Sequence, residues 1–449
     1  RDRAPRMVLG QPTPTVGREK EVATLQGIYD EMLRDSFPRL ALVLGTPGIG
    51  KSRVRSELAQ RLELAPMPPE VVICRGDAHT GGTSVSGLGK SLRALMGVQD
   101  GADASSQVAL VKRFVRARLP RSLHFLPPLL PICAAFRGEL VGVPFPGQND
   151  EPLRAARANE QLMESRIRSA LEAYVRTQAG RIPQVFMVED AHLMDDTTKG
   201  LFEWLLGCPD LRMVIFAFGT PELAERLPPM DDKKNVTTLE LGGIPRVAAE
   251  RIVQIVLPQL SEDRRAELAR RAAGNPLVLE ELVRCAAEGR DEVPLTVQAL
   301  VQQRLDRLDP DVREAVRAAA VFGQSFWTGG LAALLDHGVD DLLTKAEEDE
   351  IIIRHETSRV AGQTEWMFRQ ALVRDVAHAS LLDEDRRALH FAAGEWLEAA
   401  GNVDLGLIAG HYEVGGDNDR AASLYARATQ QALRKLGQMD IALDLAKRG

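Results

Sequence analysis

The fold is decided by one stretch, Gly45-Thr46-Pro47-Gly48-Ile49-Gly50-Lys51-Ser52. It matches the pattern GxxxxGK[ST] in full, between an apolar run at 39–44 and a helical pattern at 53–64. Glycines at these places let the backbone curl, so that its N–H groups point at phosphate oxygens, and the helix N-terminus adds positive charge. We therefore predict a phosphate-binding loop. In it Lys51 reaches the β- and γ-phosphates and the Ser52 hydroxyl ligates Mg²⁺.

An acidic pair after a second apolar run supplies the other half of the expected site. The run 185–188 is followed directly by Glu189 and Asp190. One carboxylate would hold Mg²⁺, directly or through water, and the other would orient the attacking water. The sequence leaves open which residue does which. Acidic residues after a strand are also common helix caps, but the complete loop upstream favours the site.

Apolar runs and helical patterns alternate in the first half of the chain. Further strands are predicted at 71–74 and 213–218, and one long helix is predicted at 153–178. Strands that alternate with helices favour a parallel sheet with helices on both faces. The predicted fold class is therefore an α/β P-loop domain.

The second half of the chain is predicted to be mainly helical. Two short strand-like runs, 351–353 and 365–368, follow helices, and this order is typical of a winged-helix domain. Near the end, two helices flank the turn 415–418 and resemble one tetratricopeptide unit. A lone unit buries its face poorly, so we expect further repeats beyond this chain.

These patterns predict five segments. They are a linker at 1–13, a nucleotide-binding domain at 14–245, a small helical domain at 246–292, a winged-helix domain at 293–398 and tetratricopeptide-like helices at 399–449.

Composition narrows the class of protein. The 449 residues carry a formal net charge of −7, which argues against binding duplex DNA by bulk charge. No apolar run reaches the roughly 18 residues of a membrane helix, so no membrane contact is expected. The cysteines lie far apart at Cys74, Cys133, Cys208 and Cys285, which favours a reducing cytoplasm over disulfides or zinc. The start at Arg1 leads us to expect a piece of a longer protein.

Together with other motifs, these residues resemble the STAND class of P-loop ATPases, which are signal-transduction switches related to AAA+ proteins. The further motifs are Val16-Gly17-Arg18-Glu19, the run 189–196, Gly274-Asn275-Pro276-Leu277 and Phe368-Arg369-Gln370-Ala371-Leu372. In this class the first motif lies near adenine, the run 189–196 is an extended Walker B motif, and Pro276 would pack on the nucleotide. A narrower resemblance, to the ATPase module of large bacterial serine/threonine kinases, draws on the run 138–145.

The resemblance implies a site for ATP or ADP with Mg²⁺. Nucleotide contacts are expected from Val16, Gly17, Arg18, Gly45, Thr46, Pro47, Gly48, Ile49, Gly50, Lys51, Ser52, Arg53 and Pro276. Catalysis is expected from Lys51, Glu189 and Asp190, and magnesium binding from Ser52, Glu189 and Asp190.

Two residues depart from the class pattern. Thr220 stands where an arginine often precedes Pro-Glu, and Gln370 stands where histidine is usual. A threonine donates one hydrogen bond but carries no charge to offset a γ-phosphate. Both departures concern turnover and discrimination between ADP and ATP more than binding itself.

The leading hypothesis is an ATP-binding switch with weak hydrolysis, acting as the regulatory module of a larger, kinase-linked protein. Its partners would be nucleotide, proteins bound by the C-terminal repeats, and further copies in a nucleotide-dependent homo-oligomer. One alternative is a nucleotide-locked scaffold without turnover. Another is an ATP-dependent transcriptional regulator, but the helix predicted at 302–317 balances its arginines with acids and argues against nucleic acid. No HRD or DFG run is present, so this chain has no kinase motif.

Overall fold

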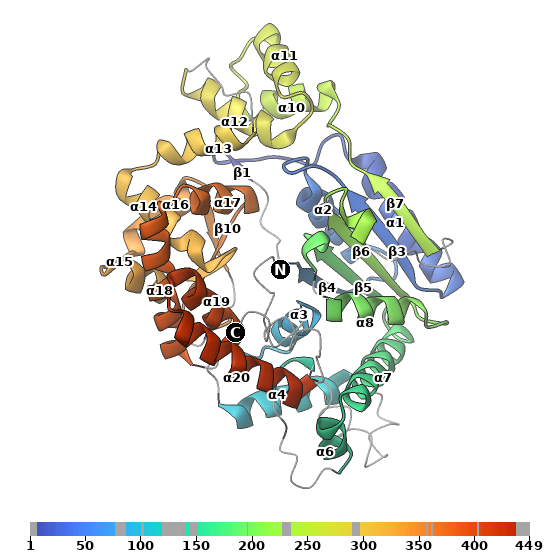
Figure 1. Ribbon diagram of the computed structural model, residues 1–449. Coiled ribbons are helices and arrows are strands. Elements are labelled where there is room, and N and C mark those ends of the chain that lie inside the picture. The colour runs from blue at the N-terminus through green and yellow to red at the C-terminus, as the bar shows by residue number, and fades with distance from the viewer. Residues whose placement is uncertain are drawn as a thin grey trace.

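The computed structural model describes most of the chain (Figure 1). The described residues are 7–76, 87–99, 103–118, 138, 140–143, 145, 151–194, 196–226, 235–289, 297–355, 358–360, 362–401 and 404–436. The predicted linker start, Cys133, Asp195, Glu139, Pro144 and residues 437–449 lie outside them.

A parallel sheet forms the centre of the first half. Its strands, in the order in which they pair, are β4 (Glu70–Arg75), β5 (Gln184–Glu189), β6 (Met213–Gly219), β3 (Arg39–Leu44) and β7 (Val236–Glu240). All neighbouring pairs are parallel. The predicted α/β sheet is confirmed. The prediction missed β7, because this edge strand is only half-buried and polar in sequence.

Helices cover both faces of the sheet because its central strands are apolar on both sides. Along β3, Ala41 and Val43 face the layer that includes α1 (Glu19–Asp35) and α2 (Lys51–Glu63). Leu40 and Leu42 face the opposite layer. That layer is built from α3 (Gly87–Leu95), α4 (Ala104–Arg118), α6 (Glu151–Ala158), α7 (Glu160–Ala179) and α8 (Asp196–Leu206).

The single helix predicted at 153–178 is wrong, because α6 and α7 are separate helices. Asn159 lies between them in an extended conformation, and its side chain accepts a hydrogen bond from the Leu162 N–H. Asparagine is a preferred N-cap, so it starts a new helix here.

A small helical part follows the sheet. It contains α10 (Arg246–Val256), α11 (Glu262–Arg271) and α12 (Pro276–Ala287). Its core also takes in Val8 from a hairpin of β1 (Met7–Val8) and β2 (Gln11–Pro12). Part of the segment predicted as a linker is therefore paired and packed.

The C-terminal half is mostly helical, with a small antiparallel sheet in the order β8 (Ser325–Trp327), β10 (Glu365–Phe368), β9 (Ile352–Arg354). Its helices are α13 (Val297–Asp306), α14 (Pro310–Ala319), α15 (Thr328–Leu335), α16 (Asp340–Glu348), α17 (Ala371–Ala379), α18 (Asp383–Ala400), α19 (Leu405–Gly415) and α20 (Asn418–Leu436). The single helix predicted at 302–317 is wrong. Asp309 caps α14 and Pro310 begins it, so the chain turns between α13 and α14.

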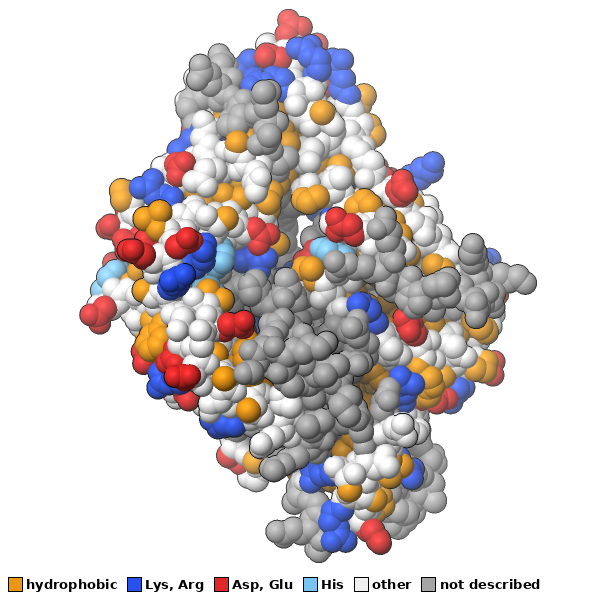
Figure 2. Space-filling model, viewed as in Figure 1, with side chains coloured by type: hydrophobic (Ala, Val, Ile, Leu, Met, Phe, Trp, Pro, Cys, Tyr) orange, Lys and Arg blue, Asp and Glu red, His pale blue; other side chains and the backbone are white. Residues whose placement is uncertain are grey.

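In Figure 1 the sheet domain and the C-terminal half lie on opposite sides of the molecule, and α10 to α12 join them at one end. At the other end, α20 returns to contact α6 and α7. On the face seen in Figure 2, the basic and acidic side chains of the described residues are interspersed. No described helix has the length and apolar character that crossing a membrane requires.

Candidate functional site

The loop between β3 and α2 has the backbone that its glycines predict. Gly48 and Gly50 have φ angles of 79° and 100°, which side chains with a Cβ rarely adopt. The Lys51 Nζ donates hydrogen bonds to the carbonyl oxygens of Gly45 (2.7 Å) and Thr46 (3.1 Å). Burial lowers the pKa of Lys51, against the attraction of Asp190. The Lys51 side chain therefore folds back onto the backbone of its own loop.

The acidic pair lies next to this loop, at the carboxyl end of β5. Glu189 is buried and hydrogen-bonds Ser52, while Asp190 begins the turn to η3 (Ala191–Leu193) with a φ of 47°. Burial raises the pKa of Asp190, and Arg75 and Lys51 partly offset this effect. The structure thus brings together the three residues predicted to bind Mg²⁺.

Glu189 is held by two arginines that the sequence prediction did not include. The Arg55 Nε lies 2.9 Å from Oε1 of Glu189, and the Arg75 Nη2 pairs with Oε2. Burial alone would raise the pKa of Glu189, but the charges of Arg75 and Arg55 bring it down to about 2. Arg55 could have been noticed because it lies one helical turn after Lys51. Arg75 could not, because its register opposite Glu189 requires the strand order.

A cavity of about 50 Å³ lies beside the loop, between the sheet domain and the small helical part. Its lining includes these residues predicted to contact nucleotide: Val16, Arg18, Ile49, Gly50, Arg53 and Pro276. Thr13, Thr15 and Glu280 also line it and were not predicted.

Arg18 and Arg53 shape this cavity through contacts with the protein itself. Arg18 is buried, and its Nη2 donates to the carbonyl oxygens of Ile49 (2.8 Å) and Gly242 (2.7 Å). The Arg53 Nε donates to Oγ1 of Thr15 at 2.9 Å. Arg18 therefore braces the phosphate-binding loop from behind.

The start of α12 lies directly on the phosphate-binding loop. A Cβ added to Gly48 would come within 2.9 Å of the Leu277 Cβ and 3.1 Å of Oδ1 of Asn275. The Asn275 Nδ2 also lies 3.4 Å from the Pro47 carbonyl oxygen. The motif at 274–277 therefore lies against the loop. Gly17 is packed in a similar way against α10, since a Cβ added to it would lie 2.7 Å from the Ala248 Cβ.

Of the two departures from the class pattern, Thr220 lies next to the loop, because the carbonyl oxygen of the preceding Gly219 accepts a 3.0 Å hydrogen bond from the Gly45 N–H. Thr220 follows β6, and its hydroxyl donates to Oε2 of Glu222 at 3.0 Å. Gln370 precedes α17, and its buried Oε1 has no hydrogen-bond partner among the described residues.

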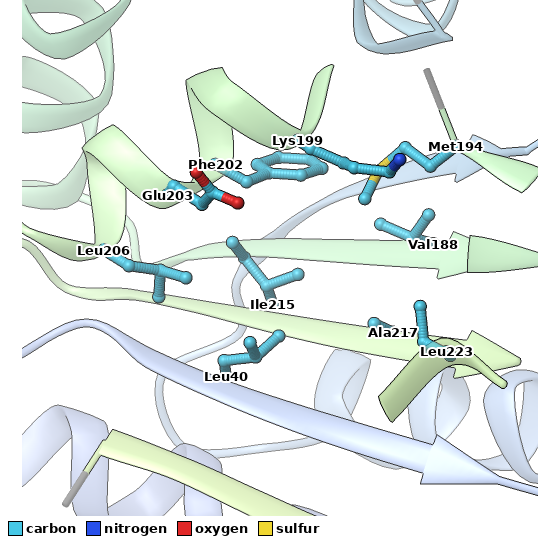
Figure 3. A pocket seen from close by; sticks show the side chains of 10 residues that line it. All are labelled: Leu40, Val188, Met194, Lys199, Phe202, Glu203, Leu206, Ile215, Ala217 and Leu223. Atoms are coloured by element: carbon cyan, nitrogen blue, oxygen red, sulfur yellow. The ribbon is translucent and has the colours of Figure 1, made fainter. Parts of the chain in front are cut away.

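A different cavity lies between α8 and the sheet (Figure 3). It measures about 20 Å³, and its lining is apolar except for Lys199 and Glu203. Phe202 and Leu206 of α8 face Ile215 of β6 across it. This apolar cavity offers a ligand few polar groups to bind. The cavity beside the phosphate-binding loop is therefore the candidate nucleotide site.

Comparison with known proteins matches residues 14–216 to the AAA ATPase domain. Over 446 residues the chain is 26% identical to an uncharacterized protein of Rhizobium meliloti (strain 1021), covering 93% of this chain and 41% of that protein. This chain therefore spans about two-fifths of the length of its curated relative.

Among solved structures, the chain is similar to a Signal Transduction ATPase with Numerous Domains (STAND) protein with a tetratricopeptide repeat sensor from Pyrococcus horikoshii. The match covers 99% of this chain and 58% of that chain, with 12% identity and a TM-score of 0.52. It shows a shared fold, with a P-loop domain followed by mainly helical parts.

Proposed function

From the match of residues 14–216 to the AAA ATPase domain, we propose that the protein is an ATP-binding regulatory switch with slow hydrolysis. One observation carries the proposal. The phosphate-binding loop lies between the acidic pair at the end of β5 and the N-terminus of α12. A nucleotide bound there would contact both the sheet domain and the small helical part, so ATP and ADP could favour different arrangements of the two.

The residues around the loop fit a magnesium nucleotide. Hydroxyl and carboxylate oxygens are the ligands that Mg²⁺ prefers, and Ser52, Glu189 and Asp190 supply them. When bound, the ion would neutralise phosphate charge. Lys51 would exchange the carbonyl oxygens of Gly45 and Thr46 for phosphate oxygens. Asp190 would orient the attacking water, because Glu189 is already held by two arginines.

We propose slow turnover because Thr220, the residue that follows β6, is uncharged. The Thr220 hydroxyl is bonded to Glu222 and brings no positive charge toward the site. Stabilising the charge of the transferring phosphoryl group is the main task in such reactions. A nucleotide-locked scaffold without turnover remains the second candidate, and the same observation favours it.

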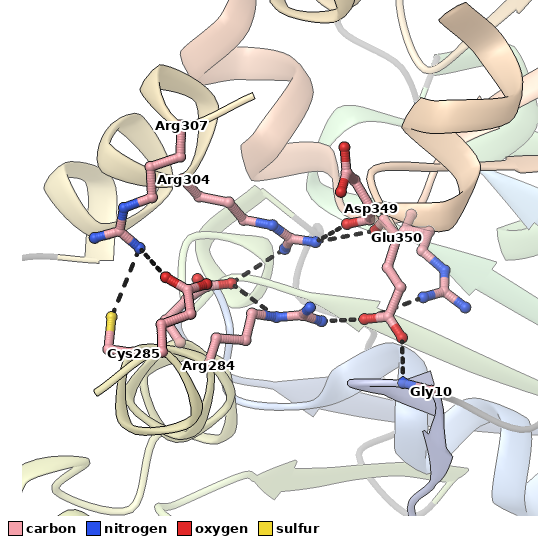
Figure 4. Close-up of polar contacts among 10 residues, drawn as sticks. Gly10, Arg284, Cys285, Arg304, Arg307, Asp349 and Glu350 are labelled. Atoms are coloured by element: carbon pink, nitrogen blue, oxygen red, sulfur yellow. Dashed lines mark hydrogen bonds and ion pairs between the residues drawn. The ribbon is translucent and has the colours of Figure 1, made fainter. Parts of the chain in front are cut away.

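A buried ion network would transmit the state of the site to the C-terminal half (Figure 4). Glu281 and Arg284 lie on α12, the helix whose start touches the loop. Glu281 pairs with Arg304 of α13 at 3.1 Å, and Arg284 pairs with Glu350 before β9. Glu350 also accepts a 3.4 Å hydrogen bond from the Gly10 N–H of the N-terminal hairpin. A shift of α12 would therefore strain contacts in three other segments.

We also propose the wider setting from the resemblance. The chain would be the regulatory module of a larger, kinase-linked protein in the cytoplasm. Protein partners would bind the C-terminal helices, and nucleotide would control assembly into a homo-oligomer. Nucleic acid is not proposed as a partner, since Arg304, one of the arginines expected on a surface helix, is buried against Glu281.

Lys51→Ala tests the site. We expect the purified chain to release stoichiometric ADP on denaturation, and the variant to bind a fluorescent ATP analogue at least about a hundredfold more weakly, since a charge-assisted phosphate contact is lost. Lys345→Ala is the matched control, because Lys345 is exposed and pairs only loosely with Asp309 at 3.7 Å. Equal affinity in Lys51→Ala and wild type would refute the site. Retained, unhydrolysed ATP would favour the scaffold.

A further inference from the structure

Glu189 stands where a magnesium-facing carboxylate is expected, yet both of its oxygens contact arginines. Oε1 accepts from the Arg55 Nε and Oε2 pairs with the Arg75 Nη2. A carboxylate that binds two guanidinium groups has little negative charge left to offer a metal ion. The two arginines therefore compete directly with Mg²⁺ for Glu189.

The two arginines differ in their surroundings. Arg55 is buried on α2, whereas the Arg75 side chain at the end of β4 is 34% exposed. Arg75 also reaches across to the C-terminal half, where its Nη1 lies 3.4 Å from the Met367 Sδ on β10. Arg75 therefore contacts both Glu189 and a residue beyond the sheet domain.

The backbone fixes Arg75 in this position. The next residue, Gly76, donates a 2.8 Å hydrogen bond to the Glu189 carbonyl oxygen. A Cβ on Gly76 would lie 2.2 Å from the Asp190 carbonyl oxygen, so the end of β4 is held against the acidic turn. A second contact nearby, from the Gln99 Nε2 to the Ser358 carbonyl oxygen at 3.2 Å, joins the same two parts of the molecule.

We propose that Arg75 is a positioning residue that occupies the magnesium-facing carboxylate while β10 is docked on the sheet domain. It thereby sets the Mg²⁺ concentration at which nucleotide binds. This inference rests on the proposed nucleotide site. Mg²⁺ and Arg75 bind Glu189 in competition, so tighter metal binding loosens the contact with Met367, and undocking of β10 favours metal binding by the same factor.

The test measures how the affinity for a fluorescent ATP analogue depends on Mg²⁺ concentration. Arg75→Gln removes the competing cation, so we expect half-maximal binding at Mg²⁺ concentrations about tenfold lower than in wild type, which corresponds to about 1.4 kcal/mol. Arg75→Lys keeps a positive charge and should restore most of the wild-type requirement. In the same samples, hydrogen exchange of the β10 amides should speed up in Arg75→Gln.

Arg118→Gln is the matched control. Arg118 is 28% exposed and pairs at 2.9 Å with Glu70, at the opposite end of the same strand. Its loss should leave both the Mg²⁺ dependence and the exchange of β10 unchanged.

Three results are decisive. An Mg²⁺ requirement in Arg75→Gln within twofold of wild type would overturn the inference, and so would a higher requirement, which would mean that Arg75 holds the nucleotide itself. Failure of wild type to bind the analogue at any Mg²⁺ concentration would instead refute the proposed function. If Arg75→Gln does not fold, Met367→Ala must lower the Mg²⁺ requirement for the inference to stand.

Discussion

Gly17 shows how closely the small helical part approaches the candidate nucleotide site. Its φ is 75°, and an added Cβ would lie 2.7 Å from the Ala248 Cβ and 2.9 Å from the Pro245 Cδ. Real Cβ atoms do not approach other carbons so closely, so any side chain here would push α10 away. The motif containing Gly17 was predicted to lie near adenine, and the structure adds a packing reason for the glycine.

We expect Gly17→Ala to lower the free energy of unfolding by about 1–3 kcal/mol through overpacking and left-handed strain, and to weaken nucleotide binding. Gly97→Ala is the control, because Gly97 has a φ of 73° with nothing within 4 Å of an added Cβ. Thermal unfolding and titration with the ATP analogue measure the two effects. Equal losses in both variants would show that backbone strain alone matters, without the contact with α10.

At the scale of elements, α12 carries the connection between the site and the rest of the molecule. Asn275 caps it by accepting hydrogen bonds from the Leu277 (3.0 Å) and Val278 (3.4 Å) N–H groups. The same side chain touches the Pro47 carbonyl oxygen. One residue therefore starts the helix and positions it on the phosphate-binding loop.

Asn275→Ala should cost about 0.5–2 kcal/mol of stability, as the loss of other N-caps does. It should also weaken nucleotide binding, because the contact with Pro47 is lost. Ser261→Ala removes the cap of α11, where the Ser261 Oγ accepts from the Arg264 N–H at 3.3 Å. This control should lose stability without losing affinity. Equal nucleotide affinity in Asn275→Ala and Ser261→Ala would show that the start of α12 does not contribute to the nucleotide site.

Elements with strong local signals could be predicted from sequence. The phosphate-binding loop, Glu189 and Asp190 follow from short motifs next to apolar runs, and the helix break at Asn159 could have been read from its capping preference. The edge strand β7 and the pairing of Arg75 with Glu189 could not. The strand β7 is polar and only half-buried, and the pairing of Arg75 with Glu189 depends on the strand order, in which distant segments become neighbours.

At the scale of the whole molecule, the network around Glu350 joins the small helical part to the C-terminal half. Glu350 pairs with Arg284 of α12 and lies 3.7 Å from the Arg369 Nη1. The side chains of Glu350, Arg284 and Arg369 are largely shielded from water. Added salt therefore screens their attraction much less than it screens exposed ion pairs. The contact of α20 with α6 and α7 also joins the C-terminal half to the sheet domain.

Glu350→Gln leaves Arg284 and Arg369 without their shared anion, and breaking a buried pair in this way costs about 3–5 kcal/mol. We expect a lower melting temperature and a larger radius of gyration in solution scattering, as α12 separates from the C-terminal half. Glu347→Gln is the control, because the exposed Glu347 side chain accepts a 3.3 Å hydrogen bond from the Arg354 N–H, which a glutamine oxygen can also accept. An unchanged radius in Glu350→Gln would show that other contacts hold the two parts together.

The strand order also governs how the chain emerges from the ribosome. Of the five strands of the parallel sheet, β3 is synthesised first but lies between β6 and β7, which are synthesised last. At about 5–20 residues per second, the roughly 170 residues from the end of β3 to β6 take on the order of 8–35 seconds to make. Throughout that interval the apolar segment 40–44 has no strand beside it. Nascent chains of this protein should therefore depend on chaperones that shield an early strand until its neighbours are translated.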